Sequence, residues 1–125
     1  MMPKLLAACA AICTLLTPSA LAAERPLKGA EIDTLIKGNT VTGKSDGKVW
    51  TQTFTPSGDT IYSGGSRPPS KGLWTIRGDK FCSQWPPSDS WACYGVTGDL
   101  DANPKTITWI SESGTTYPGS VKAGM

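Results

Sequence analysis

Residues 80–94 read KFCSQWPPSDSWACY, and this stretch decides how the rest of the chain folds. Four turn-forming residues, Pro86–Asp89, separate two predicted strands that each carry one cysteine. The stretch therefore predicts an antiparallel hairpin in which Cys82 faces Cys93. Facing residues in such a hairpin have numbers with one common sum, here 175. The same register places Phe81 opposite Tyr94, Ser83 opposite Ala92 and Trp85 opposite Ser90.

Cys82 and Cys93 are the two cysteines that follow the N-terminal leader described below, and we expect them to form a disulfide. Cysteine pairs of exported proteins become oxidised, because the compartments outside the cytoplasm are oxidising. The alternatives are a reactive thiol and half of a metal site. The chain has no histidine, and no third cysteine follows the leader, which makes zinc implausible. We expect Cα atoms about 5.5–6 Å apart across the bond.

Residues 1–23 have the composition of a cleaved signal peptide. One lysine precedes the apolar stretch Leu5–Leu16, and Ala20–Ala22 forms a small-x-small cleavage site. The apolar stretch is shorter than the roughly 20 residues that cross a bilayer, so we expect no membrane span. Residues 24–125 then form a single β domain, periplasmic or secreted. The alternative is a lipoprotein cleaved before Cys9, but the apolar core would then be too short.

From Asn39 on, the hydrophobic pattern changes from helical to alternating, and clusters of turn-forming residues interrupt it. Turn signals at a spacing of roughly 8–12 residues are typical of antiparallel sandwiches and barrels. We therefore expect an all-β fold, a single antiparallel meander or barrel-like domain of about seven or eight strands. The predicted strands are Thr40–Lys44, Val49–Thr55, Thr60–Ser63, Gly72–Arg77, Lys80–Trp85, Trp91–Thr97, Thr106–Ser111 and a weaker Tyr117–Lys122, after a short arm at 24–26.

One short N-terminal helix is predicted over residues 29–37. Ile32, Leu35 and Ile36 recur at helical spacing, and Gly38 follows as a C-terminal stop. A helix this short is not stable alone. We therefore expect its apolar stripe to pack on a sheet or to cover a barrel mouth.

Composition excludes several classes of function. Twelve basic and ten acidic residues give a net charge of +2, and the lysines form no basic stripe, so we expect no nucleic-acid partner. The lack of histidine excludes Ser-His-Asp and Cys-His catalysis. The carboxylates stand in no recognisable catalytic pair, and Gly64–Ser66 precedes prolines instead of a phosphate-binding helix. We expect no enzyme, no catalytic residue and no cofactor.

A partial calcium motif occurs where Asp99, Asp101 and Asn103 place side-chain oxygens at alternate positions. Pro104 then replaces the required glycine of an EF-hand loop, and Ile110 stands where the bidentate glutamate belongs. We interpret the segment as a surface turn and expect no metal.

Five tryptophans are many for a domain of this size. Trp50, Trp74 and Trp109 occupy alternating strand positions and are predicted to be core. Trp85 and Trp91 flank the Pro-Pro turn, where they either form an exposed patch for sugar stacking or protein docking, or pack on each other and on the prolines. The candidate binding residues are Trp85, Pro86, Pro87, Asp89 and Trp91.

The chain resembles a group of small secreted bacterial proteins of unknown function. The matching residues are Ile32, Leu35, Ile36 and Gly38–Thr40, then Gly72–Trp74, then 79–85, then Cys93–Tyr94. They form a Gly-x-Trp strand followed by a two-cysteine hairpin. The resemblance implies a lipocalin-like or similar compact β fold and implies no activity.

These features favour an exported, non-enzymatic β domain that acts as a binding module, with a protein or a cell-envelope component as its partner. Two alternatives are a protein inhibitor of a cell-wall lytic enzyme and a binder of a small ligand or glycan. A rigid exposed loop carrying tryptophan or charge would favour the inhibitor. An unfilled barrel interior would favour the small-ligand binder.

Overall fold

The computed structural model describes residues 23–125. Within them the chain forms nine strands and one helix. The elements are β1 (Arg25–Pro26), α1 (Gly29–Ile36), β2 (Asn39–Ser45), β3 (Lys48–Phe54), β4 (Asp59–Gly64), β5 (Ser70–Arg77), β6 (Lys80–Gln84), β7 (Trp91–Asp99), β8 (Thr106–Ile110) and β9 (Thr116–Ala123). The eight predicted strands are all present, with ends within two residues of the prediction.

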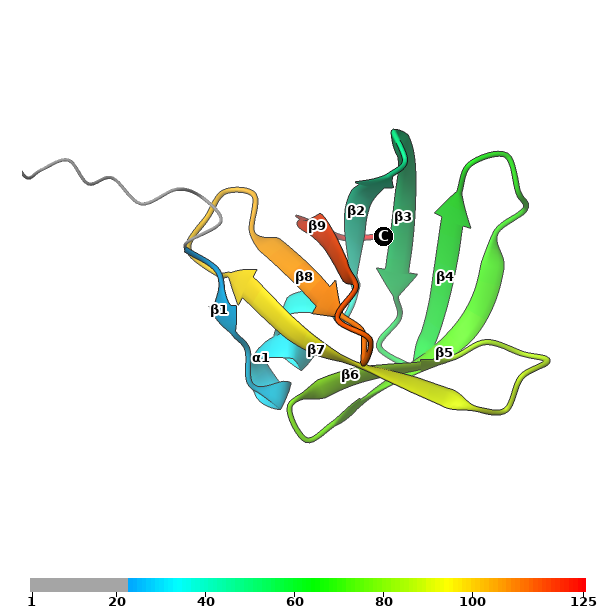
Figure 1. The fold of residues 1–125 in the computed structure, drawn as a ribbon, viewed down its shortest axis with the longest axis horizontal. Coiled ribbons are helices and arrows are strands. Elements are labelled where there is room, and N and C mark those ends of the chain that lie inside the picture. Colours follow the sequence, from blue (N-terminus) through cyan, green and yellow to red (C-terminus); the bar gives the residue numbers. More distant parts are fainter. Residues whose placement is uncertain (1–22) are drawn as a thin grey trace, which may run out of the picture.

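Strands β2 to β9 form a closed up-and-down barrel (Figure 1). Each strand pairs antiparallel with the next along the chain, and β9 returns to pair with β2. Closure leaves no unpaired edge along the ring. The predicted all-β antiparallel meander is therefore confirmed, and its barrel-like form is a closed eight-stranded barrel.

Strand β1 is the element that the sequence pattern did not predict. Arg25 and Pro26 pair with Gly98 and Thr97 on β7, so the expected arm adds a ninth strand to the sheet. Two residues are too few to show any alternation. The carboxylate of Glu24 fixes the start of this arm, because the hydroxyls of Thr97 and Thr108 both donate to it, at 2.8 and 2.9 Å.

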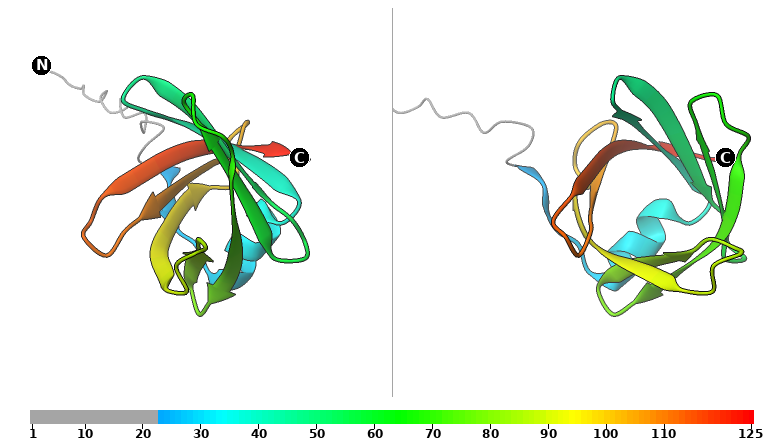
Figure 2. Two further views of the ribbon diagram at one scale, coloured as in Figure 1. Left: turned by 90° about the vertical axis from the view of Figure 1, so that its right-hand side faces the viewer. Right: turned by 45° about the vertical axis from the view of Figure 1, so that its right-hand side comes forward.

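The helix α1 crosses one end of the barrel (Figure 2), and its predicted apolar stripe is buried there. Ile32 and Ile36 are fully buried and join the core of the barrel. At its start the Gly29 N–H donates to the carboxylate of Asp79, in the β5–β6 turn, at 2.8 Å. Gly38 ends the helix with a φ of 77°, a conformation that glycine adopts without strain.

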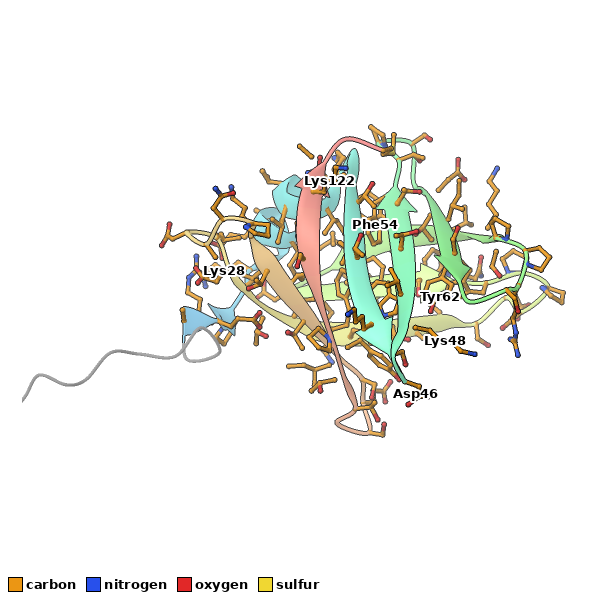
Figure 3. The ribbon with its side chains drawn as sticks, turned by 90° about the horizontal axis from the view of Figure 1, so that it is seen from above. Lys28, Asp46, Lys48, Phe54, Tyr62 and Lys122 are labelled. Carbon is orange, nitrogen blue, oxygen red and sulfur yellow. A yellow bond between two sulfur atoms is a disulfide. The ribbon has the colours of Figure 1, made fainter. Side chains whose placement is uncertain are left out.

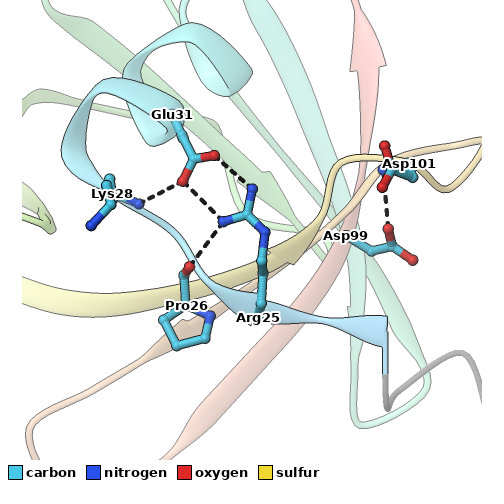
Figure 4. A network of polar contacts seen from close by, with 6 residues as sticks. All are labelled: Arg25, Pro26, Lys28, Glu31, Asp99 and Asp101. Atoms are coloured by element: carbon cyan, nitrogen blue, oxygen red, sulfur yellow. Dashed lines mark hydrogen bonds and ion pairs between the residues drawn. The ribbon is translucent and has the colours of Figure 1, made fainter.

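A network of polar contacts ties the arm to the helix (Figure 4). The Arg25 guanidinium donates to both carboxylate oxygens of Glu31, at 3.0 and 2.6 Å, and the Lys28 N–H donates to the same carboxylate at 3.0 Å. These bonds lower the pKa of Glu31 to about 2, with the Arg25 contact as the largest cause.

The half of the barrel next to α1 is filled. Phe54 is fully buried there, and its ring packs edge-on against Trp74 and Phe81 with centroids 6.0 and 5.6 Å away. The three tryptophans predicted as core, Trp50, Trp74 and Trp109, are each 5–6% exposed. In Figure 3, Phe54 and Lys122 lie toward one end of the barrel, whereas Tyr62 and Asp46, in the β2–β3 turn, lie toward the other.

The predicted disulfide hairpin is confirmed in its register. Cys82 pairs with Cys93, and the two sulfur atoms are bonded. The Cα atoms are 4.0 Å apart, so the expected 5.5–6 Å is wrong. In an antiparallel ladder, opposed residues at non-hydrogen-bonded positions have Cα atoms about 4.5 Å apart, which is closer than in most disulfide-linked pairs.

One pairing of the hairpin is also wrong. The ladder ends at Gln84 opposite Trp91, and Trp85 does not face Ser90 in it. The loop therefore covers residues 85–90, where the Ser88 N–H donates to the carbonyl of Trp85 at 3.0 Å. This local bond closes a turn within the loop in place of the last rung.

The signal peptide prediction, like the lipoprotein alternative at Cys9, falls almost entirely on residues outside the described part of the chain. Among residues 23–125, no helix has both the length and the apolar character needed to cross a membrane.

Candidate functional site

A cavity of about 540 Å³ opens at the end of the barrel opposite α1. The β2–β3, β4–β5, β6–β7 and β8–β9 connections lie at this end, because each even-numbered strand leads away from the helix. We call the cavity the aromatic cup. Its wall is formed by Ser45, Trp50, Gln52, Tyr62, Ser70, Lys71, Phe81, Ser83, Trp85, Pro86, Tyr94, Trp109 and Tyr117.

The strand register explains why these residues line the cup. In a barrel alternate residues face inward, so Trp50, Gln52 and Phe54 share the inner face of β3. Tyr62 pairs with Gln52, and Tyr117 pairs with Trp109, so both tyrosines face inward too. Lys71 pairs with Ile61, and both side chains face outward. Lys71 therefore reaches the cup only at its rim.

The floor of the cup is aromatic. The rings of Phe81 and Trp109 have centroids 4.4 Å apart, and both contact Phe54 on the filled side. Phe81, Ser83 and Trp109 are 3–5% exposed, whereas Tyr62 and Tyr117 at the mouth are 37% and 41% exposed. The cup thus passes from a buried base to a solvent-facing rim.

Glycines opposite two tryptophans keep the cup open. A Cβ atom on Gly72 would lie 2.7 Å from Cε3 of Trp85, and one on Gly43 would overlap the ring of Trp50. Each indole therefore packs directly against the backbone of a neighbouring strand, at the position where that strand has a glycine. A bulkier residue at either glycine would push the indole away from the wall.

Few polar groups of the wall are engaged with each other. The Trp85 indole N–H donates to the hydroxyl of Ser83 at 3.1 Å, and the Gln52 amide donates to Thr60 at 2.9 Å. Burial raises the pKa of the Tyr94 phenol, with a smaller contribution from Tyr117, so the hydroxyl stays neutral at physiological pH. The cup thus presents neutral hydrogen-bonding groups on an aromatic surface.

The structure separates the residues predicted as a binding patch. Trp85 and Pro86 line the cup, while Pro87 and Asp89 are exposed in the loop outside it. Trp91 pairs with Gln84 on the outer face, where the Arg77 guanidinium lies 4.9 Å from its ring centroid.

The two tryptophans therefore occupy opposite faces of the sheet and do not pack on each other. The register itself contained this information. Trp91 faces Gln84, which is one residue from Trp85 and so points the other way.

Sequence reasoning missed the larger part of the wall, including Tyr62, Tyr94 and Tyr117. It also assigned Trp50 and Trp109 to the core, which is correct for their burial but omits that both line the cavity. These wall residues could have been found as the inward-facing strand positions near the end of the barrel that is far from the helix.

A second hollow, a groove of about 1180 Å³, lies at the helix end of the barrel. It runs between α1, the 100–105 loop and the end of β9, and its wall holds the exposed side chains of Lys105 and Lys122. No aromatic residue lines it among those described. The aromatic cup is therefore the better-defined candidate, because buried side chains enclose it.

The calcium-like segment forms a turn closed on itself. The Asp101 N–H donates to the carboxylate of Asp99 at 3.0 Å, as Figure 4 shows. Within residues 23–125 no three histidine, cysteine, aspartate or glutamate side chains gather as a metal site would require.

Comparisons with protein-family models, with curated proteins and with solved structures found no significant match. The side chains of the cup define the chemistry that it offers. They can stack on a flat ligand and form hydrogen bonds with it.

Proposed function

We propose that this protein is an exported, non-enzymatic domain that binds a small organic ligand in the aromatic cup. One observation carries the proposal: the barrel is filled beside α1 and hollow at the other end, where seven aromatic residues surround about 540 Å³. Small-ligand sites are concave, mostly apolar and about 300–1,000 Å³ in volume.

Pre-organised rings support binding in such a site. Trp50 stacks on Tyr62 with centroids 6.0 Å apart, and Tyr94 packs edge-on against Tyr117 at 6.4 Å. Rings held by their neighbours lose little conformational entropy when a ligand arrives. Most of the entropy cost of ordering these rings is therefore already met when the protein folds, before a ligand binds.

The inhibitor alternative has less support. Its best feature is the 85–90 loop, whose base is fixed by the disulfide and by a bond of 2.7 Å from the Gln84 amide to the Asp89 carbonyl. However, neither tryptophan is displayed at the tip, where the exposed residues are prolines, serines and Asp89. Such residues are not typical of protein-binding hot spots.

The non-enzymatic part of the proposal rests on the chemistry of the wall. The cup residues are aromatic, hydroxyl-bearing or amide-bearing, apart from Pro86 and Lys71. Export is supported by the Cys82–Cys93 disulfide, which is compatible with an oxidising compartment, and by the composition of residues 1–23.

The proposal is tested with N-phenyl-1-naphthylamine, an uncharged probe that fluoresces in apolar sites. We expect saturable binding of one probe per protein, using protein exported from the full-length chain. Ser83→Phe places a ring in the cup and should abolish the signal. Ser63→Phe adds the same ring on the outward set of β4, opposite Thr51, and should leave it unchanged.

Two results would contradict small-ligand binding in the cup. One is the absence of saturable fluorescence with the unmodified protein. The other is equal affinity for the probe in Ser83→Phe and Ser63→Phe.

A further inference from the structure

Two indole N–H groups of the cup have no partner among the residues that the structure describes. Trp50 and Trp109 are 6% and 5% exposed and line the cup, yet their Nε1 atoms make no hydrogen bond within the described residues. No fully buried side-chain nitrogen or oxygen of these residues lacks a partner. The two N–H groups must therefore reach solvent, and the cup is the hollow that both side chains line.

The other polar groups of the wall add mainly donors. The Ser83 hydroxyl accepts from Trp85 and keeps its own hydrogen to donate. The Gln52 amide donates one N–H to Thr60, which leaves its second N–H as a donor and its carbonyl oxygen as an acceptor. An indole can only donate, so the deep wall offers more fixed donors than fixed acceptors.

The charge of the wall also favours a ligand with acceptor atoms. Among the described residues that line the cup, Lys71 at the rim is the one with a formal charge, and no carboxylate is present. A cation would gain from the aromatic faces but would meet the positive ends of the indole N–H dipoles without a counter-charge. A ligand with acceptor atoms would satisfy those N–H groups.

We infer that the cup takes a flat or cyclic organic molecule that carries carbonyl or carboxylate acceptors and no positive charge, with an acceptor bonded to the Trp50 or Trp109 N–H. This inference rests on the proposed function and specifies its ligand. The ring of the ligand lies among the tyrosines and Trp85, while its acceptor points toward the floor.

The test uses four naphthalene probes of similar size in calorimetric titrations: 2-naphthoate, 2-naphthamide, 2-naphthylmethylammonium and 2-methylnaphthalene. We expect the two probes with acceptors to bind at least about tenfold more tightly than the ammonium, the worth of about one hydrogen bond. Trp50→Phe and Trp109→Phe keep a ring but remove the N–H. The variant that removes the N–H bonded to the acceptor should weaken 2-naphthamide by about five- to tenfold, so at least one of the two must show this loss.

Two controls separate the N–H from the shape of the ring. The same variants should change the affinity of 2-methylnaphthalene by less than about twofold, because this probe has no acceptor and loses no hydrogen bond. Trp91→Phe alters an indole on the outer face and should change neither probe. Where a buried substitution prevents folding, the four-probe comparison in the unmodified protein still tests the ligand class.

The outcomes distinguish the inference from the function on which it rests. Ammonium binding as tight as that of 2-naphthamide, or equal losses for 2-naphthamide and 2-methylnaphthalene in the tryptophan variants, overturns the ligand class and leaves small-ligand binding intact. Failure of all four probes together with N-phenyl-1-naphthylamine overturns both.

Discussion

Glu31 receives three hydrogen bonds although it lies at the surface, two from Arg25 and one from the Lys28 backbone. Each bond favours the ionised carboxylate, which is why its pKa falls from 4.5 to about 2. A depressed pKa in the folded state means that the ionised group stabilises the fold above pH 4.5. This contribution is lost as the pH falls toward 2.

Arg25→Met should therefore raise the pKa of Glu31 toward 4.5, because the main donor is removed. The Lys28 N–H remains, so the value should stay somewhat below 4.5. Carbon-13 NMR titration of the carboxyl group measures the shift, and Arg67→Met, in the exposed β4–β5 loop, is the control. A Glu31 pKa that is the same in both variants would contradict the pairing.

Gly72 determines the shape of the cup at a single position. A Cβ atom there would lie 2.5 Å from the Gln84 carbonyl and 2.7 Å from the Trp85 ring. Gly72→Ala should therefore cost about 1–3 kcal/mol of unfolding free energy through overpacking and should weaken binding of N-phenyl-1-naphthylamine. Urea denaturation and probe titration measure the two effects.

Gly95→Ala is the matched control, since a Cβ atom on Gly95 meets nothing closer than 3.9 Å. It should change stability by less than about 0.5 kcal/mol. If both alanine variants behave alike, close contact with Trp85 is not what requires glycine at position 72.

At the scale of elements, the β6–β7 hairpin is stabilised by its disulfide. The bond closes a loop with a sequence separation of 11, for which chain entropy predicts a contribution of about 3 kcal/mol. Replacing Cys82 and Cys93 together by alanine should lower the unfolding free energy by about 2–4 kcal/mol. In the native protein, neither Cys82 nor Cys93 should react with iodoacetamide.

A reductant provides the control for this prediction. Dithiothreitol should bring the unmodified protein to about the stability of the double-alanine variant and leave that variant unchanged. Equal stability of the oxidised protein and the variant would show that the bond is not structural.

Most elements could be predicted because their signals are local. Alternation defines the strands, the spacing of Ile32, Leu35 and Ile36 defines the helix, and Cys82 with Cys93 fixes one register. Pairing between β2 and β9 joins segments about 80 residues apart, and no local pattern encodes it. The resemblance to secreted proteins of unknown function stays a prediction.

The candidate site could be predicted only in part for the same reason. Trp85 was found because it lies next to a turn, whereas Tyr62 and Tyr117 meet it only once the ring has closed. Whether inward residues fill a barrel or leave a hollow depends on the summed volumes of eight strands. Gly43 and Gly72 reduce the side-chain volume at two points of the wall, because neither has a side chain.

At the scale of the whole molecule, the barrel has two halves of unequal packing. Beside α1, Ile32, Phe54 and Ile107 are fully buried, so opening this half exposes the most apolar surface. Around the cup, the wall residues face a hollow on one side and so have fewer partners. Local opening should therefore be easier at the cup than at the helix end.

Amide hydrogen exchange should consequently be slowest at the helix-side residues Phe54, Val96 and Ile107, and faster at the strand ends around the cup, such as Ser45 and Ser70. All of these residues lie in strands, so the difference reflects packing more than secondary structure. A ligand that fills the cup should slow exchange mainly at the cup end, because it supplies the missing contacts there. At a free concentration of 100 times Kd it should also raise the unfolding free energy by about 2.7 kcal/mol. Exchange rates that are uniform along the strands, or a ligand that protects the helix end first, would contradict this division of the barrel.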